Sequence, residues 1–281
     1  NDLTARIVAD RLKEVLGRPV YVENKPGAAQ RLTLNELRRS PPDGRTLALA
    51  TTGPFAIYPH IYTKLDYDPF KDFTPIAAVA TFDVGIASGP KTNARTVAEL
   101  VDAARANPDN AIYGSPGNGS LSHVGTVLLE QETSTKMTHV PYKGSGAAIA
   151  DVVGGQVQLF MTTPPSVLGH IQTGKLRAYA VTSKTRHPML PNVPTTTEAG
   201  LPGFELEAWV GLFAPAGTPQ AVANQLTEAA KKALDTPEAK ARGAAQGIEV
   251  RFLGQEALAA LVKRETDYWT KVIKSRNITA D

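Results

Sequence analysis

Strand-like and helix-like segments alternate along the middle of this 281-residue chain, and this alternation constrains the fold more than any other feature. Short apolar runs rich in β-forming residues occur at residues 111–113, 138–140, 157–161 and 176–182. Helix-like stretches follow the first three of these runs, beginning near Ser120, Gly146 and Pro165. Because parallel strands need a crossover connection, such alternation is typical of a parallel sheet covered by helices. The sequence therefore predicts an α/β fold.

The two ends of the chain extend this pattern. Residues 2–16 place apolar side chains at helical spacing, and strand-like runs follow at 20–22 and 46–50, with turns and a helix between them. Thr96 and Glu99 have the spacing of a capping box. After residue 217 we expect three helices, with N-caps in front of the prolines at Thr218 and Thr236.

The length of the chain favours two domains. The order of the predicted elements places one lobe at residues 1–87 with 207–281, so that both chain ends build it. A second lobe, residues 88–206, is inserted between them. We found no internal repeat that would suggest a solenoid or a propeller.

Composition and spacing exclude several classes of protein. The absence of cysteine excludes disulfides, thiolate metal sites and cysteine nucleophiles. The net charge of +3 is small and dispersed, which is not the footprint of a nucleic-acid-binding protein. No apolar run reaches the length of a membrane-spanning helix, and the sequence does not open on a signal peptide. The histidines lack metal-ligand spacing, so we expect neither a metal nor a cofactor.

A glycine-rich turn at residues 113–123 is the strongest candidate for a binding site. It reads Tyr-Gly-Ser-Pro-Gly-Asn-Gly-Ser-Leu-Ser-His and joins a predicted strand to a predicted helix. Its glycines allow close approach to the backbone, and the first amides of the helix, its dipole and the hydroxyls of Ser115 and Ser120 suit an anion. The alternative is that the glycines serve a tight connection and Ser120 caps its own helix.

Two kinds of chemistry are disfavoured for this turn. Ser122 occupies the place of the third glycine of a dinucleotide fingerprint, and no P-loop lysine follows. Ser120 and His123 can share one helical face, which raises nucleophilic catalysis. However, the sequence has no Gly-x-Ser-x-Gly nucleophile elbow, so we do not expect an enzyme. A carboxylate-processing enzyme that uses Ser120 and His123 remains an alternative.

Polar residues at two other predicted strand ends are further candidates for ligand contact. These are Thr51 with Thr52 and Thr162 with Thr163, since ligands of open α/β sheets bind beyond the carboxyl ends of strands. The alternative is β-propensity followed by a turn. Lys143 lies in a turn that could present a cation to an anion, or could be solvated. Phe55 and Trp209 are candidates for an aromatic wall of the site, although a core position is the default for Trp209.

Eight short motifs occur in a particular order along the chain. They are Val-Glu-Asn-Lys-Pro-Gly-Ala at 22–28, Pro-Asp-Gly at 42–44, Lys-Asp-Phe-Thr-Pro-Ile-Ala at 71–77, the turn at 114–123, His-Val-Pro-Tyr-Lys-Gly at 139–144, Gly-Gly-Gln-Val at 154–157, Pro-Asn-Val-Pro-Thr at 191–195 with Glu-Ala-Gly at 198–200, and Ala-Pro-Ala-Gly-Thr-Pro at 214–219. Taken together, and over essentially the whole chain, they resemble the substrate-binding proteins of tripartite tricarboxylate transporters, known as the Bug family.

The resemblance implies a type II periplasmic-binding-protein fold, in which two α/β lobes close around a small organic or amino acid in a cleft. It also implies a bacterial periplasmic location and delivery of a carboxylate to membrane permease subunits by a monomer. The ligand-sensing domain of a transcription regulator, which can share this fold, is the alternative.

The family grips a ligand carboxylate with two loops, through backbone amides and waters. One loop matches residues 114–120. The other follows a first strand and ends in Asn-Asp or Thr-Asp, which matches Asn1 and Asp2, while the strand itself is absent from this sequence. The predicted ligand-binding residues are Asn1, Asp2, Thr51, Thr52, Phe55, Ser115, Gly117, Asn118, Gly119, Ser120, His123, Thr162, Thr163 and Trp209.

Overall fold

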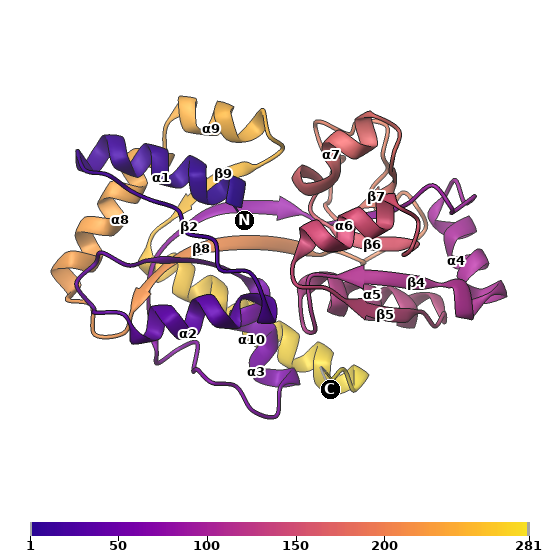
Figure 1. Ribbon diagram of the computed structural model, residues 1–281, viewed down its shortest axis with the longest axis horizontal. Coiled ribbons are helices and arrows are strands. Elements are labelled where there is room, and N and C mark those ends of the chain that lie inside the picture. Colours follow the sequence, from indigo (N-terminus) through magenta and orange to yellow (C-terminus); the bar gives the residue numbers. More distant parts are fainter. Residues whose placement is uncertain (1, 280–281) are drawn as a thin grey trace. The chain divides into compact units, whose positions relative to one another are not determined.

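The computed structural model describes residues 2–279, which form two compact units (Figure 1). Among the described residues, unit 1 combines residues 2–81 with 209–279, and unit 2 is the inserted segment 82–208. Both units combine helices with a sheet, so the α/β prediction is confirmed. The division into ligand-binding lobes at residues 87/88 and 206/207 stays a prediction.

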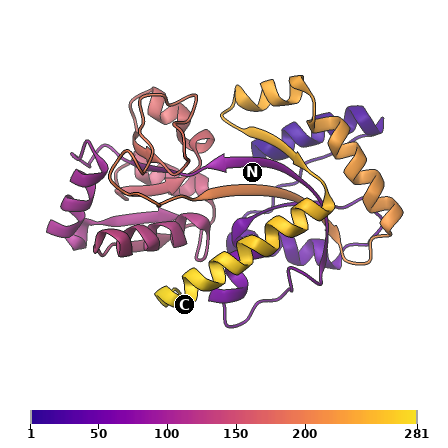
Figure 2. The ribbon, with the colours of Figure 1, turned by 180° about the vertical axis from the view of Figure 1, so that it is seen from behind.

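Unit 1 is built around a four-stranded sheet in the order β1-β8-β2-β9. Its strands are β1 (Ala48–Thr51), β2 (Phe73–Asp83), β8 (Glu207–Pro215) and β9 (Glu249–Leu253). Its helical elements are α1 (Asp2–Leu16), η1 (Ala28–Gln30), α2 (Arg31–Arg39), η2 (Gly53–Ile57), α3 (Tyr58–Ile61), α8 (Gln220–Leu234), α9 (Pro237–Ala244) and α10 (Gln255–Arg276). Figure 2 shows α10 crossing one face of this sheet, where Leu258, Leu261 and Val262 join a core with Phe55, Trp209 and Phe213.

Unit 2 is built around a five-stranded sheet in the order β5-β4-β6-β3-β7. Its strands are β3 (Gly85–Ser88), β4 (Ile112–Ser115), β5 (Thr138–Pro141), β6 (Leu159–Thr162) and β7 (Arg177–Val181). Its helical elements are α4 (Val97–Ala106), η3 (Pro108–Asn110), α5 (Leu121–Thr133), α6 (Ser145–Val153) and α7 (Pro164–Gln172). Strands β5, β4 and β6 are parallel, as the alternation predicted, whereas β3 runs antiparallel to both of its neighbours.

Two of the three predicted helix caps are present. The Thr96 hydroxyl accepts the Glu99 N–H at 3.1 Å, and the Thr236 hydroxyl accepts the Ala239 N–H at 3.1 Å. The prediction that Thr218 is an N-cap was wrong. Its hydroxyl instead donates to the carbonyl of Pro215 at 2.8 Å, which closes the turn after β8, and α8 begins at Gln220.

The prediction of a strand at residues 20–22 was also wrong. These residues lie in an irregular stretch between α1 and η1, and the Tyr21 side chain is 87% exposed. β-propensity reflects packing against neighbouring strands, and within the described residues this stretch pairs with none. Conversely, β9 was not predicted, although charged and apolar side chains alternate from Glu249 to Phe252.

The turn that leads into α2 is strained. Ala28, Ala29 and Gln30 have φ values of 44°, 48° and 72°, in the left-handed region that L-residues rarely occupy. Two hydrogen bonds hold the turn there, because Tyr58 Oη donates to the Ala29 carbonyl at 2.8 Å and Thr51 Oγ1 donates to Gln30 Oε1 at 2.9 Å. The cost of the left-handed backbone is therefore offset by contacts with β1 and α3.

Replacing Ala29 with glycine should raise the free energy of unfolding by about 0.5 to 1 kcal/mol, because the relief of left-handed strain exceeds the added entropy of the unfolded chain. The matched control is Ala260→Gly in the exposed interior of α10, which should lower it by about 1 kcal/mol. Urea titrations of both variants measure these changes. A destabilising Ala29→Gly substitution would mean that the turn carries no strain.

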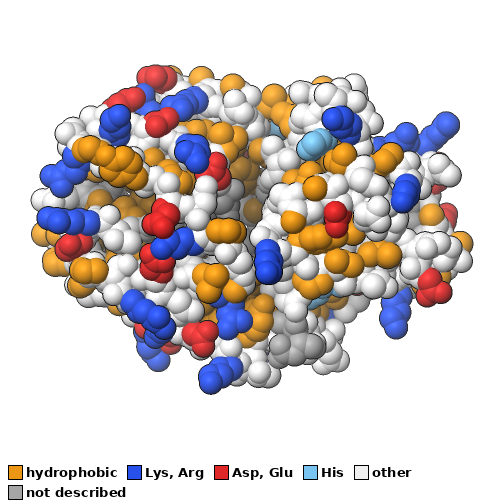
Figure 3. Space-filling model, in the orientation of Figure 1, with side chains coloured by type: hydrophobic (Ala, Val, Ile, Leu, Met, Phe, Trp, Pro, Cys, Tyr) orange, Lys and Arg blue, Asp and Glu red, His pale blue; other side chains and the backbone are white. Residues whose placement is uncertain are grey.

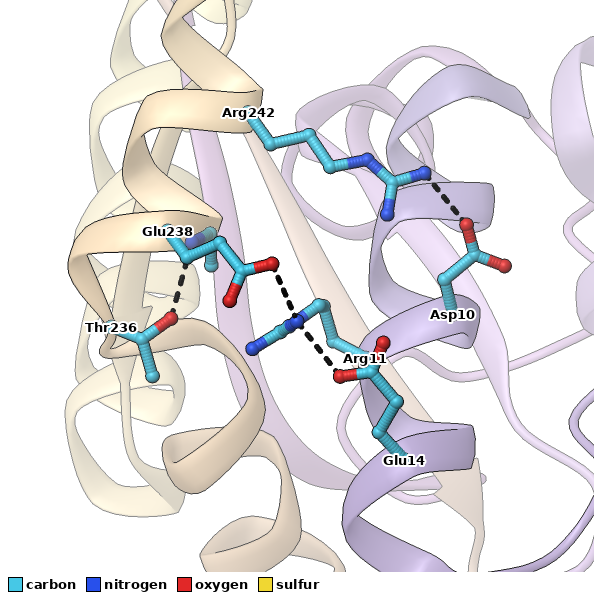
Figure 4. A network of polar contacts seen from close by, with 7 residues as sticks. Asp10, Arg11, Glu14, Thr236, Glu238 and Arg242 are labelled. Carbon is cyan, nitrogen blue, oxygen red and sulfur yellow. Dashed lines mark hydrogen bonds and ion pairs between the residues drawn. The ribbon is translucent and has the colours of Figure 1, made fainter.

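Polar contacts join α1 to α9 within unit 1 (Figure 4). Arg242 Nη2 lies 2.7 Å from Asp10 Oδ2, and Arg11 Nη1 lies 3.2 Å from Glu238 Oε1 and 2.7 Å from Glu14 Oε2. The pair of Arg242 and Asp10 is about half exposed, and such pairs typically contribute at most about 1 kcal/mol.

The surface of the protein carries charges of both signs. On the face seen in Figure 3, basic and acidic side chains are interspersed, in keeping with the small net charge of +3. Among the described residues, no helix is both long enough and apolar enough to cross a membrane.

Candidate functional site

Three helices of unit 2 begin at one edge of its sheet. Strand β4 lies between the parallel strands β5 and β6, with Ser115 beside Pro141 and Gly114 beside Phe160. Because the three strands are parallel, their carboxyl ends share this edge, and α5, α6 and α7 follow them. Each helix therefore directs its positive dipole end toward the same edge, which favours an anion there.

Ser120 caps α5, as the alternative interpretation of the turn proposed. Its hydroxyl oxygen accepts the His123 N–H at 3.3 Å, and its carbonyl accepts the Val124 N–H at 3.0 Å. The side chain is half-buried, and its own O–H is still a donor after it has accepted this bond. Ser120 can thus cap the helix and donate to a ligand at the same time.

The amides of the two glycines in the turn are used within the turn. The Gly117 N–H donates to Ser115 Oγ at 3.1 Å, and the Gly119 N–H donates to His123 Nδ1 at 3.1 Å. Gly117 and Gly119 have φ values of 138° and 77°, which other residues adopt only with strain. The glycines therefore shape the turn, and their amides are not open to a ligand.

The open donors lie at the first two positions of α5. The first four N–H groups of any helix lack partners within the helix, and Ser120 satisfies those of His123 and Val124. For the N–H groups of Leu121 and Ser122, the described residues supply no acceptor. Together with the Ser120 hydroxyl they form three donors at the positive end of the helix, an arrangement that suits one carboxylate group.

The charges of this edge also suit an anion. The three segments that join the strands to their helices, residues 114–120, 141–146 and 162–166, contain no aspartate or glutamate. The second segment contains Lys143. Hence no carboxylate of these segments would repel an anionic ligand.

Two stacked imidazoles lie beneath the turn. The rings of Tyr113, His139 and His123 form a stack, with centroids 4.8 Å apart for the first pair and 4.2 Å apart for the second. His139 Nε2 lies 2.6 Å from the Oγ of Ser115, which is fully buried. Burial lowers the pKa of His123 to about 4, and burial together with the nearby His123 lowers the pKa of His139 to about 3. Both rings are therefore uncharged at neutral pH.

Sequence reasoning missed the contact between His139 and Ser115. The register explains the contact, because Tyr113 lies beside His139 on the neighbouring parallel strand. Only the pairing of β4 with β5 reveals it. Among the described residues, the His123 imidazole accepts the Gly119 N–H and the Ser120 hydroxyl accepts the His123 N–H, so the printed contacts of the two side chains are with the backbone of the turn and the helix start.

The predicted residues Thr162 and Thr163 lie at the same edge as the turn. Thr162 ends β6, beside β4, and its side chain is buried. Thr163 precedes α7, does not cap it with its side chain, and shares a hydrogen bond of 3.1 Å with Ser166. Asn118 lies half-buried in the turn between the two glycines. The structure thus groups these predicted residues in unit 2, and their contact with ligand stays a prediction.

The predicted residues of unit 1 are mostly in its core. Phe55 and Trp209 are each 1% exposed, with ring centroids 6.3 Å apart, and Thr52 is also 1% exposed. Thr51 ends β1 and donates to Gln30, a residue that sequence reasoning did not consider. The role of these residues in ligand contact stays a prediction.

Asp2 is the first residue of α1. Its carboxylate accepts hydrogen bonds from Arg6 Nε at 2.9 Å and from Asn24 Nδ2 at 2.5 Å. The bond from Arg6, followed by that from Asn24, lowers the pKa of the Asp2 carboxyl. Asn1 lies outside the described residues, so the predicted Asn1-Asp2 loop is described only in part. Within residues 2–279, no cluster of histidine, aspartate and glutamate side chains could hold a metal ion.

Comparisons with known proteins agree with the fold. BugT of Bordetella pertussis is 30% identical over 274 residues, which cover 97% of this chain and 84% of BugT. MatC of Rhodopseudomonas palustris with bound malate is 32% identical, with a TM-score of 0.91 over 97% of this chain and 94% of that one. Rpa4515 of R. palustris with adipate is 30% identical, with a TM-score of 0.95 over 99% of this chain and 93% of that one.

The family comparison spans nearly the whole chain. The model of the tripartite tricarboxylate transporter family receptor matches residues 4–278. The resemblance to Bug proteins and the prediction of a periplasmic-binding-protein fold are therefore confirmed. The chain belongs to the receptor family of the tripartite tricarboxylate transporters.

Proposed function

We propose that this protein is a periplasmic solute-binding protein that captures a small carboxylate and delivers it to the permease subunits of a tripartite tricarboxylate transporter. One carboxylate group of the ligand binds at the start of α5, through the N–H groups of Leu121 and Ser122 and the hydroxyl of Ser120. The protein acts as a monomer and does not transform its ligand.

The observation that carries this proposal is the set of open donors at the start of α5, in a family whose solved members include complexes with malate and with adipate. Hydrogen bonds to a charged group contribute roughly 1.5 to 3 kcal/mol each. Three of them contribute about 4.5 to 9 kcal/mol before ordering costs, so micromolar affinity, near −8 kcal/mol, also requires contacts to the rest of the ligand.

The test is a ligand panel on protein that has been unfolded, dialysed and refolded to remove any bound solute. The panel contains malate, adipate, citrate, aromatic acids, acidic amino acids and the corresponding amides as uncharged controls. A ligand that binds only the folded state raises the free energy of unfolding, and with it the thermal midpoint. At a ligand concentration of one hundred times the Kd, the gain in free energy is about 2.7 kcal/mol. Stabilisation by an acid but not by its amide supports the proposal, while turnover of the bound acid would favour an enzyme.

Replacing Leu121 with proline should weaken carboxylate binding by about ten- to a hundredfold, because it removes one N–H donor from the site. Proline is favoured at the first position of a helix, and Ser120, with φ −58° and ψ 155°, already has the conformation that a following proline requires. The helix should therefore form as before. Calorimetric titration with malate and adipate measures the loss.

The matched control is Leu121→Ala, which shortens the same half-buried side chain but keeps the N–H group. Its affinity should stay within about threefold of the wild type, since no charge-assisted hydrogen bond is lost. Equal affinities of the proline and alanine variants would show that the first amide of α5 does not bind the carboxylate. Thermal midpoints of both variants report any damage to the helix itself.

A further inference from the structure

The two imidazoles hold the turn of residues 115–120 at both of its ends. At the first end, Ser115 Oγ accepts the Gly117 N–H at 3.1 Å and bonds to His139 Nε2 at 2.6 Å. At the second end, His123 Nδ1 accepts the Gly119 N–H at 3.1 Å. The rings themselves are stacked, with centroids 4.2 Å apart and an interplanar angle of 15°. The Gly119 N–H is thus held by a ring of the stack, His123, and the Gly117 N–H is held by Ser115, which bonds to the other ring, His139.

Such support matters because of the glycines. Gly117 and Gly119 lack a Cβ atom, so the backbone between Ser115 and Ser120 could adopt many other conformations. In some of them the glycine amides would be released and the cap of α5 would be displaced. A site that binds through amides of fixed position needs such movements to be suppressed before the ligand arrives.

We infer that His123 and His139 are positioning residues of the carboxylate site, which keep residues 115–120 in the conformation that leaves the α5 amides open to ligand. This inference rests on the proposed function for its effect on binding. The hydrogen bonds to the turn exist independently of any ligand.

The protonation state of the stack decides whether it can hold the turn. Burial lowers the pKa of both histidines, so at neutral pH the Nδ1 atom of His123 is an acceptor. Protonation would turn Nδ1 into a donor that faces the Gly119 N–H, another donor. The titratable side chain of Tyr113 packs beside the two rings. Burial, followed by the charge of Glu130, raises the pKa of Tyr113. Burial also raises the pKa of Glu130 itself.

The experiment uses two pairs of variants of the whole protein. His123→Asn retains an acceptor near the position of Nδ1, and His139→Gln retains a donor near the position of Nε2. His123→Leu and His139→Leu fill the site with an apolar side chain of similar size. They remove the hydrogen bonds to the Gly119 N–H and to Ser115 Oγ, respectively. If a leucine variant fails to fold, its asparagine or glutamine counterpart and the wild type still give the measurements described next.

The first measurement is hydrogen exchange of the Gly117 and Gly119 amides, followed by nuclear magnetic resonance without ligand. We expect His123→Leu to accelerate exchange at Gly119 by about tenfold or more, because the acceptor of that amide is lost. We expect His139→Leu to accelerate exchange at Gly117 by a similar factor, because Ser115 Oγ, the acceptor of that amide, loses its bond to His139 Nε2. The asparagine and glutamine variants should stay within about threefold of the wild type, since the hydrogen bond is retained.

The second measurement is the affinity for malate and adipate at neutral and acidic pH. At neutral pH the leucine variants should bind about tenfold more weakly than the wild type, and the asparagine and glutamine variants should not. As the pH falls toward the pKa of His123, about 4, the affinity of the wild type should fall more steeply than that of the His123→Asn/His139→Gln double variant. Comparison with this variant cancels the titration of the ligand itself.

The outcomes separate the inference from the proposed function. Exchange rates and affinities of the leucine variants within twofold of the wild type would overturn the positioning role, even if the wild type binds malate well. If the wild type bound no carboxylate, the proposed function would be overturned. Faster exchange in the leucine variants would then still show that the two histidines support the turn.

Discussion

Replacing Trp209 with alanine should lower the free energy of unfolding by about 3 to 5 kcal/mol, the usual range for removing a large aromatic side chain from a core. Trp209 is 1% exposed and packs in unit 1 against Phe55 and Phe213, with ring centroids 6.3 Å and 6.5 Å away. Phe55 and Phe213 in turn stack on each other at 4.0 Å. Alanine would leave a cavity beside this aromatic cluster, and the rings around it could not fill it completely.

A variant that lacks the indole N–H of Trp209 tests whether this side chain serves the core or contacts ligand. Trp209 Nε1 is buried and has no hydrogen-bond partner among the described residues. Trp209→Phe removes this unsatisfied donor together with part of the ring, so its loss should be only about 1 to 2 kcal/mol. We expect its affinity for malate and adipate to equal that of the wild type.

Guanidinium titrations provide the measurement for both variants. Far-ultraviolet circular dichroism follows the whole chain, and the fluorescence of Trp269, which is also buried in unit 1, follows that unit alone. A loss below about 1 kcal/mol in Trp209→Ala would contradict the core assignment, since buried aromatic deletions cost more. Weakened ligand binding in Trp209→Phe at unchanged stability would support the aromatic wall predicted from the sequence.

The parallel strands of unit 2 and the helices that follow them could be predicted from local patterns, whereas the antiparallel strand β3 was not predicted. Each of the parallel strands ends near a glycine, proline or serine that starts the next helix, and the predicted starts near Ser120, Gly146 and Pro165 lie within one residue of the helices α5, α6 and α7. Here propensity and tertiary structure agree. In unit 1 they disagree at residues 20–22, where β-forming side chains find no neighbouring strand.

The candidate site could be predicted only in outline. The glycines and serines of residues 114–120 identified the turn, and they identified the first amides of the following helix, which include those of Leu121 and Ser122, as donors to an anion. The sequence did not show that Ser115 and His123 accept the N–H groups of Gly117 and Gly119, two residues that were also predicted to bind ligand. His139, which is distant in sequence, becomes part of the turn only through strand pairing. No local pattern contains that information.

Acid should destabilise unit 2 as the pH falls below 6.5, because of its two stacked histidines. Burial lowers the pKa of His123 from 6.5 to about 4, so between these values the unfolded chain binds more protons than the folded one. Stability from this group is fully present above pH 6.5 and is lost as the pH falls toward 4. The shift corresponds to about 3 kcal/mol. His139 acts in the same sense, because its pKa is lowered to about 3.

Guanidinium titrations across this pH range test the prediction, and the location of the tryptophans separates the two units. Both tryptophans, Trp209 and Trp269, belong to unit 1, so a loss that appears in circular dichroism before it appears in fluorescence belongs to unit 2. The pKa of His60 in unit 1 is also lowered by burial, and its effect would appear in the fluorescence.

The double variant His123→Asn/His139→Gln should flatten the dependence of unit 2 stability on pH, since neither new side chain titrates. His170→Gln, outside the stack, is the control that should leave it unchanged. Burial raises the pKa of Glu130, so this carboxyl holds its proton more tightly in the folded state than in the unfolded one. As the pH falls, Glu130 therefore stabilises the folded state and offsets part of the stability that the histidines lose. If the double variant kept the full dependence, the imidazole stack would not be its source. If the dependence disappeared, the same two uncharged rings that hold the turn at residues 115–120 would also account for the acid sensitivity of unit 2.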